Sequence, residues 1–298
     1  MTSVHCIVHR LHLVSQNVAK EVTYFKEYEV ICKQLYGYFN GSYKRMQNLK
    51  LMQNINKDPQ LTILNIVNTR WLSMSNVVHN LYQVIFSVID ALNDDMINAE
   101  HSKDRDKASQ LVNALDPKFI ITTMFLADLM YILSKMIKTF QCDHIDLSEV
   151  KYSLEITISA IEAQFIGTNE TPPTYGTILH QYIVDNNIPS NSLPSFISKF
   201  AKAIINSLKN RFPDSEIYNA LRIFDPKFLP QKESEISNYG DDDIKVIAEY
   251  FGNDHFSTDG KKFSAYFNII DLKQEWGMVK QIMKSIRSFN FVKGWEHI

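Results

Sequence analysis

The chain has 298 residues, of which 45% are apolar and 21% are charged, and its formal net charge is −2. This length can bury a sizeable core, and the composition excludes a disordered tail, a coiled-coil rod and a globally basic nucleic-acid binder. The sequence contains only nine glycines and nine prolines, too few for the many tight turns of a β-sandwich or barrel. Long helices are therefore favoured.

Apolar residues recur at three- and four-residue spacing along most of the chain, which predicts amphipathic helices. At Asp116-Pro117, Asp116 can cap a helix and Pro117 fits its first turn, where the missing N–H costs nothing. Ser75 is expected to cap another helix. No convincing alternating strand pattern appears, so we predict a mainly α, multi-helix protein. The expected helices cover residues 7–18, 22–39, 43–55, 76–92, 117–140, 146–161, 195–211, 241–251 and 271–287, with an irregular stretch at 223–230 and a polar loop at 253–262.

The main internal boundary is expected at residues 167–175, whose sequence GTNETPPTY is the clearest cluster of helix-breaking residues. This boundary predicts one helical region over 1–166 and a second over 176–298.

The most apolar stretch of the chain extends from Phe119 to Ile137 and is interrupted by Asp128 and Lys135. The two charges favour a buried core helix, with a membrane span as the alternative. No signal-peptide pattern is present at the N-terminus, so we expect a soluble protein without a membrane contact.

The three cysteines, Cys6, Cys32 and Cys142, lie far apart and form no CxxC pair. A disulfide framework is not expected, and an intracellular, reducing location is favoured.

Charge is unevenly distributed along the chain. Residues 1–57 hold eight Lys and Arg against three acids, and residues 213–259 hold eleven acids against four bases. The basic front end can face phosphate, but solvated helix surfaces give the same counts.

Cys6 and His9 form a Cys-x-x-His pair near the start of the chain. On a helix, this spacing puts a thiol and an imidazole on one face, where they can hold two corners of a zinc site. No second Cys/His pair at zinc-finger spacing follows, so the favoured interpretation is a buried structural pair, with zinc or a reactive thiol as alternatives. We therefore expect no metal and no cofactor.

Arg70 and Trp71 form the next candidate site, within the segment Thr69-Arg70-Trp71. The Trp ring can stack on an unpaired base while the guanidinium holds a phosphate. The structural alternative is that Trp71 is buried between helices and Arg70 pairs locally.

The acidic runs Asp94-Asp95 and Asp241-Asp242-Asp243 are weaker candidates. Mg²⁺ binding is possible in principle, but neighbouring acids at a helix end do not converge on a metal pair, so solvated caps are favoured. The sequence contains no P-loop, GxGxxG, HExxH or GxSxG motif.

Taken in order, these motifs resemble the hAT superfamily (hobo/Activator-type) of DNA transposases. The resemblance covers the Cys6-x-x-His9 helix, the aromatic-rich residues 34–49, Arg70-Trp71 and the Phe-Pro and Asp-Pro stretch at 211–230. It implies the all-helical insertion of an RNase H-like transposase without a complete RNase H sheet, a nuclear location, and a role for the tryptophan at a flipped base or hairpin. The family's first two catalytic aspartates would precede residue 1, and its third acid would follow the last residue.

These observations lead to three hypotheses about function. The first is a transposase-derived, catalytically inactive helical protein, not an enzyme, that contacts DNA, a protein partner or a second copy of itself through residues such as Arg70 and Trp71. The second is a purely structural or protein-interaction module with an exposed apolar surface on the first or last helix. The third is a fragment of a larger hAT transposase that is active only with the missing acidic residues.

Overall fold

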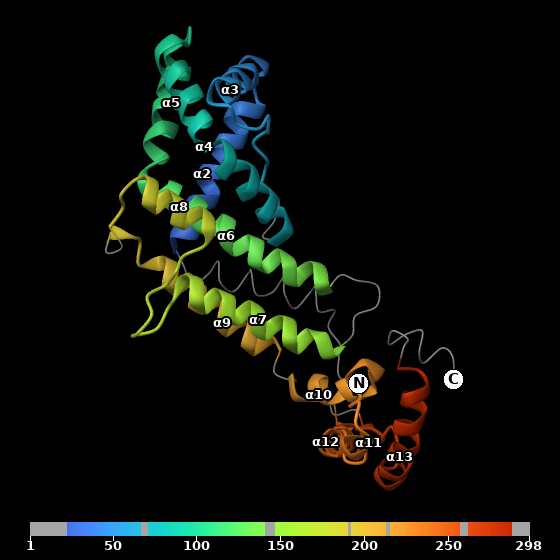
Figure 1. Cartoon of the computed structure of the whole chain (residues 1–298). Helices are drawn as coiled ribbons and strands as arrows, with labels where there is room; N and C mark the ends of the chain where they lie inside the picture. Colours follow the sequence, from blue (N-terminus) through green and yellow to red (C-terminus); the bar gives the residue numbers. More distant parts are fainter. Residues whose placement is uncertain are drawn as a thin grey trace. The chain divides into compact units, whose positions relative to one another are not determined.

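The computed structural model describes residues 23–66, 71–140, 147–189, 192–212, 215–256 and 262–287. Over these residues the protein is mainly α-helical, which confirms the predicted fold class (Figure 1). The strands in the described part are β1 and β2, of two residues each, which pair antiparallel. Contacts divide the described residues into a larger unit, within 9–137 and 157–211, and a smaller unit, within 138–156 and 212–298.

The larger unit is a helical bundle in which most of the predicted helices form. The Asp116 cap is confirmed, because its Oδ1 accepts a hydrogen bond of 2.7 Å from the Phe119 N–H. The helices are Thr23–Asn40 (α2), Tyr43–Asn56 (α3), Trp71–Asn98 (α4), Ser102–Ala114 (α5), Pro117–Phe140 (α6), Leu147–Phe165 (α7), Thr177–Asp185 (α8) and Phe196–Arg211 (α9), of which α6 and α7 each contribute only part to this unit.

The start of α4 differs from the prediction. Ser75 lies inside the helix rather than at its N-cap, so that prediction was wrong. The physical reason is that the apolar register continues toward the N-terminus: Met74 is buried like Val77 and Val78, and the backbone stays helical back to Trp71.

The core of the larger unit contains a chain of aromatic contacts between α2, α6, α7 and α9. The ring centroids of Tyr28 and Phe119 are 4.8 Å apart, and Phe125 contacts Phe165 at 4.9 Å and Phe200 at 5.8 Å. Such pairs add about 0.5–1.5 kcal/mol each beyond the area that they bury. These contacts join helices from distant parts of the sequence.

Among the described helices, α6 is long and apolar enough to cross a membrane, but 78% of its most apolar window is buried within the protein. Burial of this extent is typical of a core helix. Its one acidic residue, Asp128, is itself buried.

Asp128 caps the N-terminus of α8. Its two carboxylate oxygens accept hydrogen bonds from the backbone N–H groups of Ile178, at 3.1 Å, and Leu179, at 2.8 Å. The α8 N-cap is Gly176, and a Cβ there would come within 2.0 Å of the Asp128 Cγ. A glycine at this position thus lets the carboxylate approach the helix end.

The smaller unit is built around one apolar cluster that includes Ile223, Leu229, Ile244, Trp276 and Met283. The predicted irregular stretch at 223–230 is confirmed as two short 3₁₀ turns. The polar loop at 253–262 was only partly right, since β1 lies within it and β2 begins at its last residue. The elements are Ser215–Ala220 (α10), Leu221–Phe224 (η2), Pro226–Phe228 (η3), Glu233–Ile236 (α11), Asp241–Phe251 (α12), His255–Phe256 (β1), Lys262–Phe263 (β2) and Ile269–Ser285 (α13).

Trp276 of α13 is held at the centre of this cluster. Its indole Nε1–H donates a hydrogen bond of 2.9 Å to the backbone oxygen of Tyr239. The next residue, Gly240, has a φ of 72° and would place a Cβ 2.8 Å from the Trp276 ring. A glycine supplies both the left-handed backbone and the space that the indole needs.

The two units do not follow the predicted division at residues 167–175. Both sides of that segment belong to the larger unit, and backbone hydrogen bonds join Thr174 to Ala163 and Tyr175 to Gln164.

Replacement of Asp128 by alanine is expected to lower the free energy of unfolding by about 1–3 kcal/mol, because two N–H groups at the start of α8 lose their acceptor. Urea denaturation followed by circular dichroism measures the change. Asp106→Ala, at an exposed position of α5, is the matched control and is expected to change the stability by less than about 0.5 kcal/mol. Equal effects of the two substitutions would contradict a capping role.

The same carboxyl group is expected to give a pH dependence. Burial raises the pKa of Asp128 above its ordinary value of 3.8, although the N–H groups of Leu179 and Ile178 act in the opposite direction. Between the unfolded and the folded pKa the folded protein holds the proton more tightly, so the stability from this group is fully present below pH 3.8 and falls as the pH rises. Denaturation of wild type and Asp128→Asn from pH 4 upward measures the difference. Wild type is expected to lose stability relative to the variant as the pH rises, and a relative gain would contradict this sign.

Candidate functional site

The outer side of α3 carries a row of exposed apolar side chains. Tyr43, Leu51 and Ile55 are 79%, 54% and 63% exposed, and Gln47 completes the row at the same four-residue spacing. Side chains four residues apart lie next to each other on a helix. We call this row of Tyr43, Gln47, Leu51 and Ile55 the α3 face. Three of its four side chains are apolar, and exposed apolar side chains gathered on one face are a feature of interaction surfaces.

The ends of α3 are defined by local backbone chemistry. Ser42 is the N-cap in an extended conformation, and its hydroxyl accepts the Arg45 N–H at 3.5 Å. Lys57 ends the helix in the left-handed conformation, with a φ of 60°. The helix therefore begins and ends at these residues in a way that its own sequence explains.

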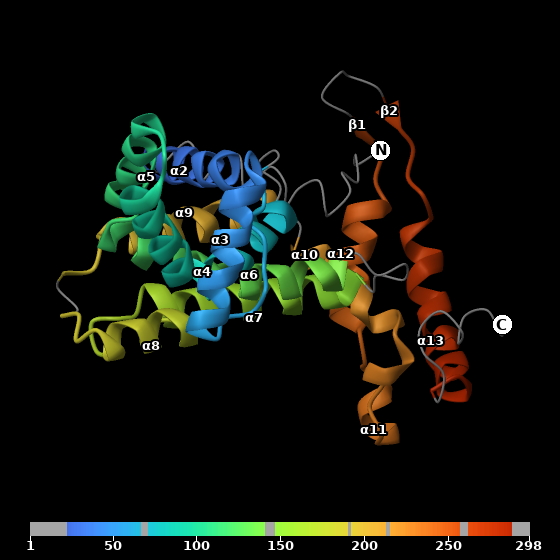
Figure 2. The same ribbon diagram turned by 90° about the horizontal axis from the view of Figure 1, so that it is seen from above.

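The inner side of α3 is held in place by buried side chains and amide hydrogen bonds. Leu49 and Gln53 are buried, and Gln53 Nε2 donates a hydrogen bond of 2.7 Å to the backbone oxygen of Leu61. The helix packs against α2 and α4 in the larger unit (Figure 1, Figure 2). It cannot rotate about its axis without breaking these contacts.

Two asparagines of α3 donate hydrogen bonds to α4. Asn48 Nδ2 lies 3.3 Å from the Ala91 oxygen and 3.0 Å from Asp94 Oδ2. At the C-terminal end of α3, Asn56 Nδ2 lies 2.7 Å from Asp90 Oδ2. Because the two asparagines lie about two turns apart on α3, they set both the position and the rotation of the helix on α4.

The cations of α3 have different roles. The helix contains Lys44, Arg45 and Lys50 and no acidic residue. Arg45 is used within the protein, since its Nη2 pairs with Asp104 at 2.7 Å and its guanidinium lies 4.0 Å from the centre of the Tyr38 ring. The two lysines are exposed on the outer side. They give the α3 face a positive border.

Tyr38 joins α2 to the acidic side of α4. Its hydroxyl donates a hydrogen bond of 2.8 Å to Asp95 Oδ2. Burial raises the pKa of Tyr38 well above its usual value, and the hydrogen bond and charge of Asp95 raise it further. The phenol therefore stays protonated and remains a donor across the physiological pH range.

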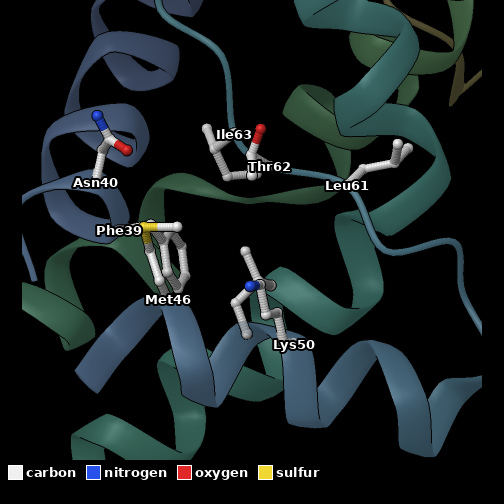
Figure 3. Close-up of a pocket in the computed structure, with 8 residues that line it drawn as sticks. Phe39, Asn40, Met46, Lys50, Leu61, Thr62 and Ile63 are labelled. Carbon is white, nitrogen blue, oxygen red and sulfur yellow. The ribbon is translucent and has the colours of Figure 1, made fainter. Parts of the chain in front are cut away.

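A small hollow lies on one side of α3, between α2, α3 and the extended segment that follows α3. Figure 3 shows Phe39, Met46 and Ile63 at the hollow, with Asn40 and Lys50 beside them. Its volume is about 10 Å³, the space of one water or one methyl group. Pockets for cofactors and drug-sized ligands begin at about 300 Å³, so the hollow can receive at most part of a side chain.

The acidic runs serve the structure. Asp94 and Asp95 accept hydrogen bonds from Asn48, so they bridge helices rather than forming the solvated cap that we predicted. Asp241 and Asp242 lie in the first turn of α12, as expected, and pair with lysines. The described residues contain no group of three His, Cys, Asp or Glu side chains arranged to hold a metal ion.

The sequence-predicted site residues are not brought together in the described structure. Cys6, His9 and Arg70 lie outside the described residues. Trp71 is the first residue of α4, and its side chain is not among those described. The proposed zinc, thiol and base-stacking roles therefore stay hypotheses.

The α3 face was not among the predicted sites, although its helix was predicted. The signal was present in the sequence: Tyr43, Gln47, Leu51 and Ile55 form one row, while Leu49 and Gln53 lie on another. Apolar residues on two sides of a helix indicate that one side is buried and the other is available.

The chain matches no protein-family model, and no curated protein or solved structure similar to it was found. The resemblance to hAT transposases therefore depends on the sequence motifs alone and stays a hypothesis.

Proposed function

We propose that the chain is a helical interaction module that acts by binding a protein partner through the α3 face, rather than by catalysis. The observation that carries this proposal is the exposed row of Tyr43, Leu51 and Ile55 on a helix whose inner side already packs and hydrogen-bonds against α4. A partner that covers the row would bury apolar surface at no cost to contacts within the unit.

A protein partner fits the surroundings of this face better than a phosphate backbone does. Acidic side chains lie close by: Glu100, in the link between α4 and α5, is 3.1 Å from the Lys44 ammonium, and Asp104 of α5 pairs with Arg45. Arg45 is taken up by Asp104, so α3 offers a phosphate backbone two lysines, whereas its exposed apolar side chains suit a protein.

The protein-partner proposal can be tested by replacing Gln47 with the photo-crosslinking residue p-benzoylphenylalanine in cells that make the protein. A discrete adduct is expected, because Gln47 lies between Tyr43 and Leu51 on the exposed row. The double variant Leu51→Ser, Ile55→Ser is expected to abolish the adduct while changing the stability by less than about 0.5 kcal/mol per surface site.

The matched control is Ile97→Ser with Val184→Ser, which removes two apolar side chains of similar exposure elsewhere in the larger unit. It is expected to leave the adduct unchanged. An adduct that survives the Leu51, Ile55 variant, or no adduct from position 47 above that from position 106, would rule out the α3 face as the binding surface.

A second candidate function is contact with DNA, as part of the hypothesis of a catalytically inactive, transposase-derived protein. The observation that favours it is the set of exposed lysines in the first third of the chain, Lys26, Lys33, Lys44, Lys50 and Lys57. Arg70 precedes the first residue of α4, and Trp71 supplies an indole that could stack on a base. The nuclear location and the homo-oligomer that this hypothesis allows stay predictions.

The DNA hypothesis predicts binding that weakens steeply as salt increases, because each phosphate contact releases counterions. A mobility-shift titration of wild type and Trp71→Ala on single-stranded and duplex DNA measures it. The variant is expected to lose affinity for single strands at every salt concentration. If wild type shows no shift at about 50 mM salt, where phosphate contacts are strongest, DNA contact is ruled out.

A further inference from the structure

We infer that the partner of the α3 face is an acidic amphipathic helix, that is, a helical segment with one apolar row bordered by Asp or Glu side chains. This inference rests on the proposed protein contact and names the chemistry of the partner. It combines the exposed apolar row, the lysines that border it and the hollow beside α3.

The length and spacing of the row suit a helix better than an extended strand. Four residues of α3 rise about 6 Å, so Tyr43, Leu51 and Ile55 extend over roughly 18 Å of helix axis. A partner helix with apolar residues at i, i+3 or i+4, and i+7 presents its side chains at the same interval. An extended peptide repeats its side chains on one face every 6.6 Å or so, but it would leave its backbone N–H groups unpaired against a helix.

The lysines lie on opposite sides of the row. Lys44 lies one turn before Asn48, on the side of the row where Asn48 contacts α4. Lys50 lies on the other side of the row, next to the hollow. No acidic residue of α3 offsets either charge. A partner helix with carboxylates on both borders of its apolar row would therefore meet one cation on each side.

The ion pair that Lys44 makes within the protein does not prevent this contact. Lys44 and Glu100 are 3.1 Å apart, but their side chains are 76% and 77% exposed. Exposed pairs of this kind contribute little and exchange readily with water or another carboxylate. Lys44 is thus available to a partner at small cost.

The hollow adds a place for a small apolar side chain beside Lys50. Phe39, Met46 and Ile63 form its apolar wall (Figure 3). A volume of about 10 Å³ accepts a methyl group and not an aromatic ring. We therefore expect the partner to present Ala or Val, rather than Phe or Trp, at the position next to the carboxylate that pairs with Lys50.

The test uses the full chain and three synthetic helical peptides that share one apolar row and carry Glu, Gln or Lys at the bordering positions. Fluorescence anisotropy measures the affinity at low and at high salt. The Glu peptide is expected to bind at least about tenfold more tightly than the Lys peptide, and the difference is expected to shrink as salt screens the charges.

Charge reversal provides the sharper comparison. Lys44→Glu with Lys50→Glu is expected to invert the order, so that the Lys peptide binds more tightly than the Glu peptide. Leu51→Ser with Ile55→Ser is expected to lose binding of all three peptides, and Ile97→Ser with Val184→Ser is expected to lose none. Circular dichroism melts check that each variant is folded.

Each outcome decides the inference. Equal binding of the three peptides overturns the acidic chemistry and leaves a protein contact at the α3 face intact. If none of the three peptides binds at about 1 mM but a photo-adduct forms at position 47, only the helical nature of the partner is overturned. If no photo-adduct forms either, both the acidic-helix inference and the protein contact at the α3 face are overturned. If the protein self-associates and Leu51→Ser abolishes the association, the occupant of the α3 face is a second copy. If duplex DNA displaces the Glu peptide, the occupant is nucleic acid. Either result overturns the inference.

Discussion

The hydrogen bonds that Asn48 and Asn56 donate to α4 set the rotation of α3 about its own axis. Apolar residues occur on both sides of this helix, so hydrophobic burial alone would let either side face the bundle. The two amides find their acceptors at Ala91, Asp94 and Asp90 of α4, which favours the rotation that turns Asn48 and Asn56 toward this helix. These contacts, together with the burial of Leu49 and Gln53, set which apolar residues are buried and which form the α3 face.

Several charged residues that look functional in the sequence have structural roles. Asp128 interrupts the most apolar stretch of the chain, yet it caps α8 from the interior. Arg45 lies in the basic front end, yet Asp104 and the Tyr38 ring hold it within the larger unit. The positive charge that remains at the α3 face therefore comes from fewer residues than the sequence suggests, and it is the lysines that carry it.

Helices with strong apolar periodicity could be predicted from the sequence, because their stability depends on a stripe that any core would bury. The four-residue repeat Phe200, Ile204 and Leu208 is buried in α9, as expected. The helices that were not predicted depend on distant partners. α5 is polar and packs with Ala108 and Leu111, and the first N–H groups of α8 are satisfied by an aspartate fifty residues earlier.

The sequence by itself determined that the protein is mainly helical, where the long helices lie, and that Asp116 starts α6, because these properties depend on residues close together along the chain. It did not locate the α3 face. When a helix has apolar residues on two sides, its own sequence does not determine which of the two sides is exposed to water. Only the tertiary structure made that choice, because it placed α4 against Asn48 and Asn56 and left Tyr43, Leu51 and Ile55 exposed.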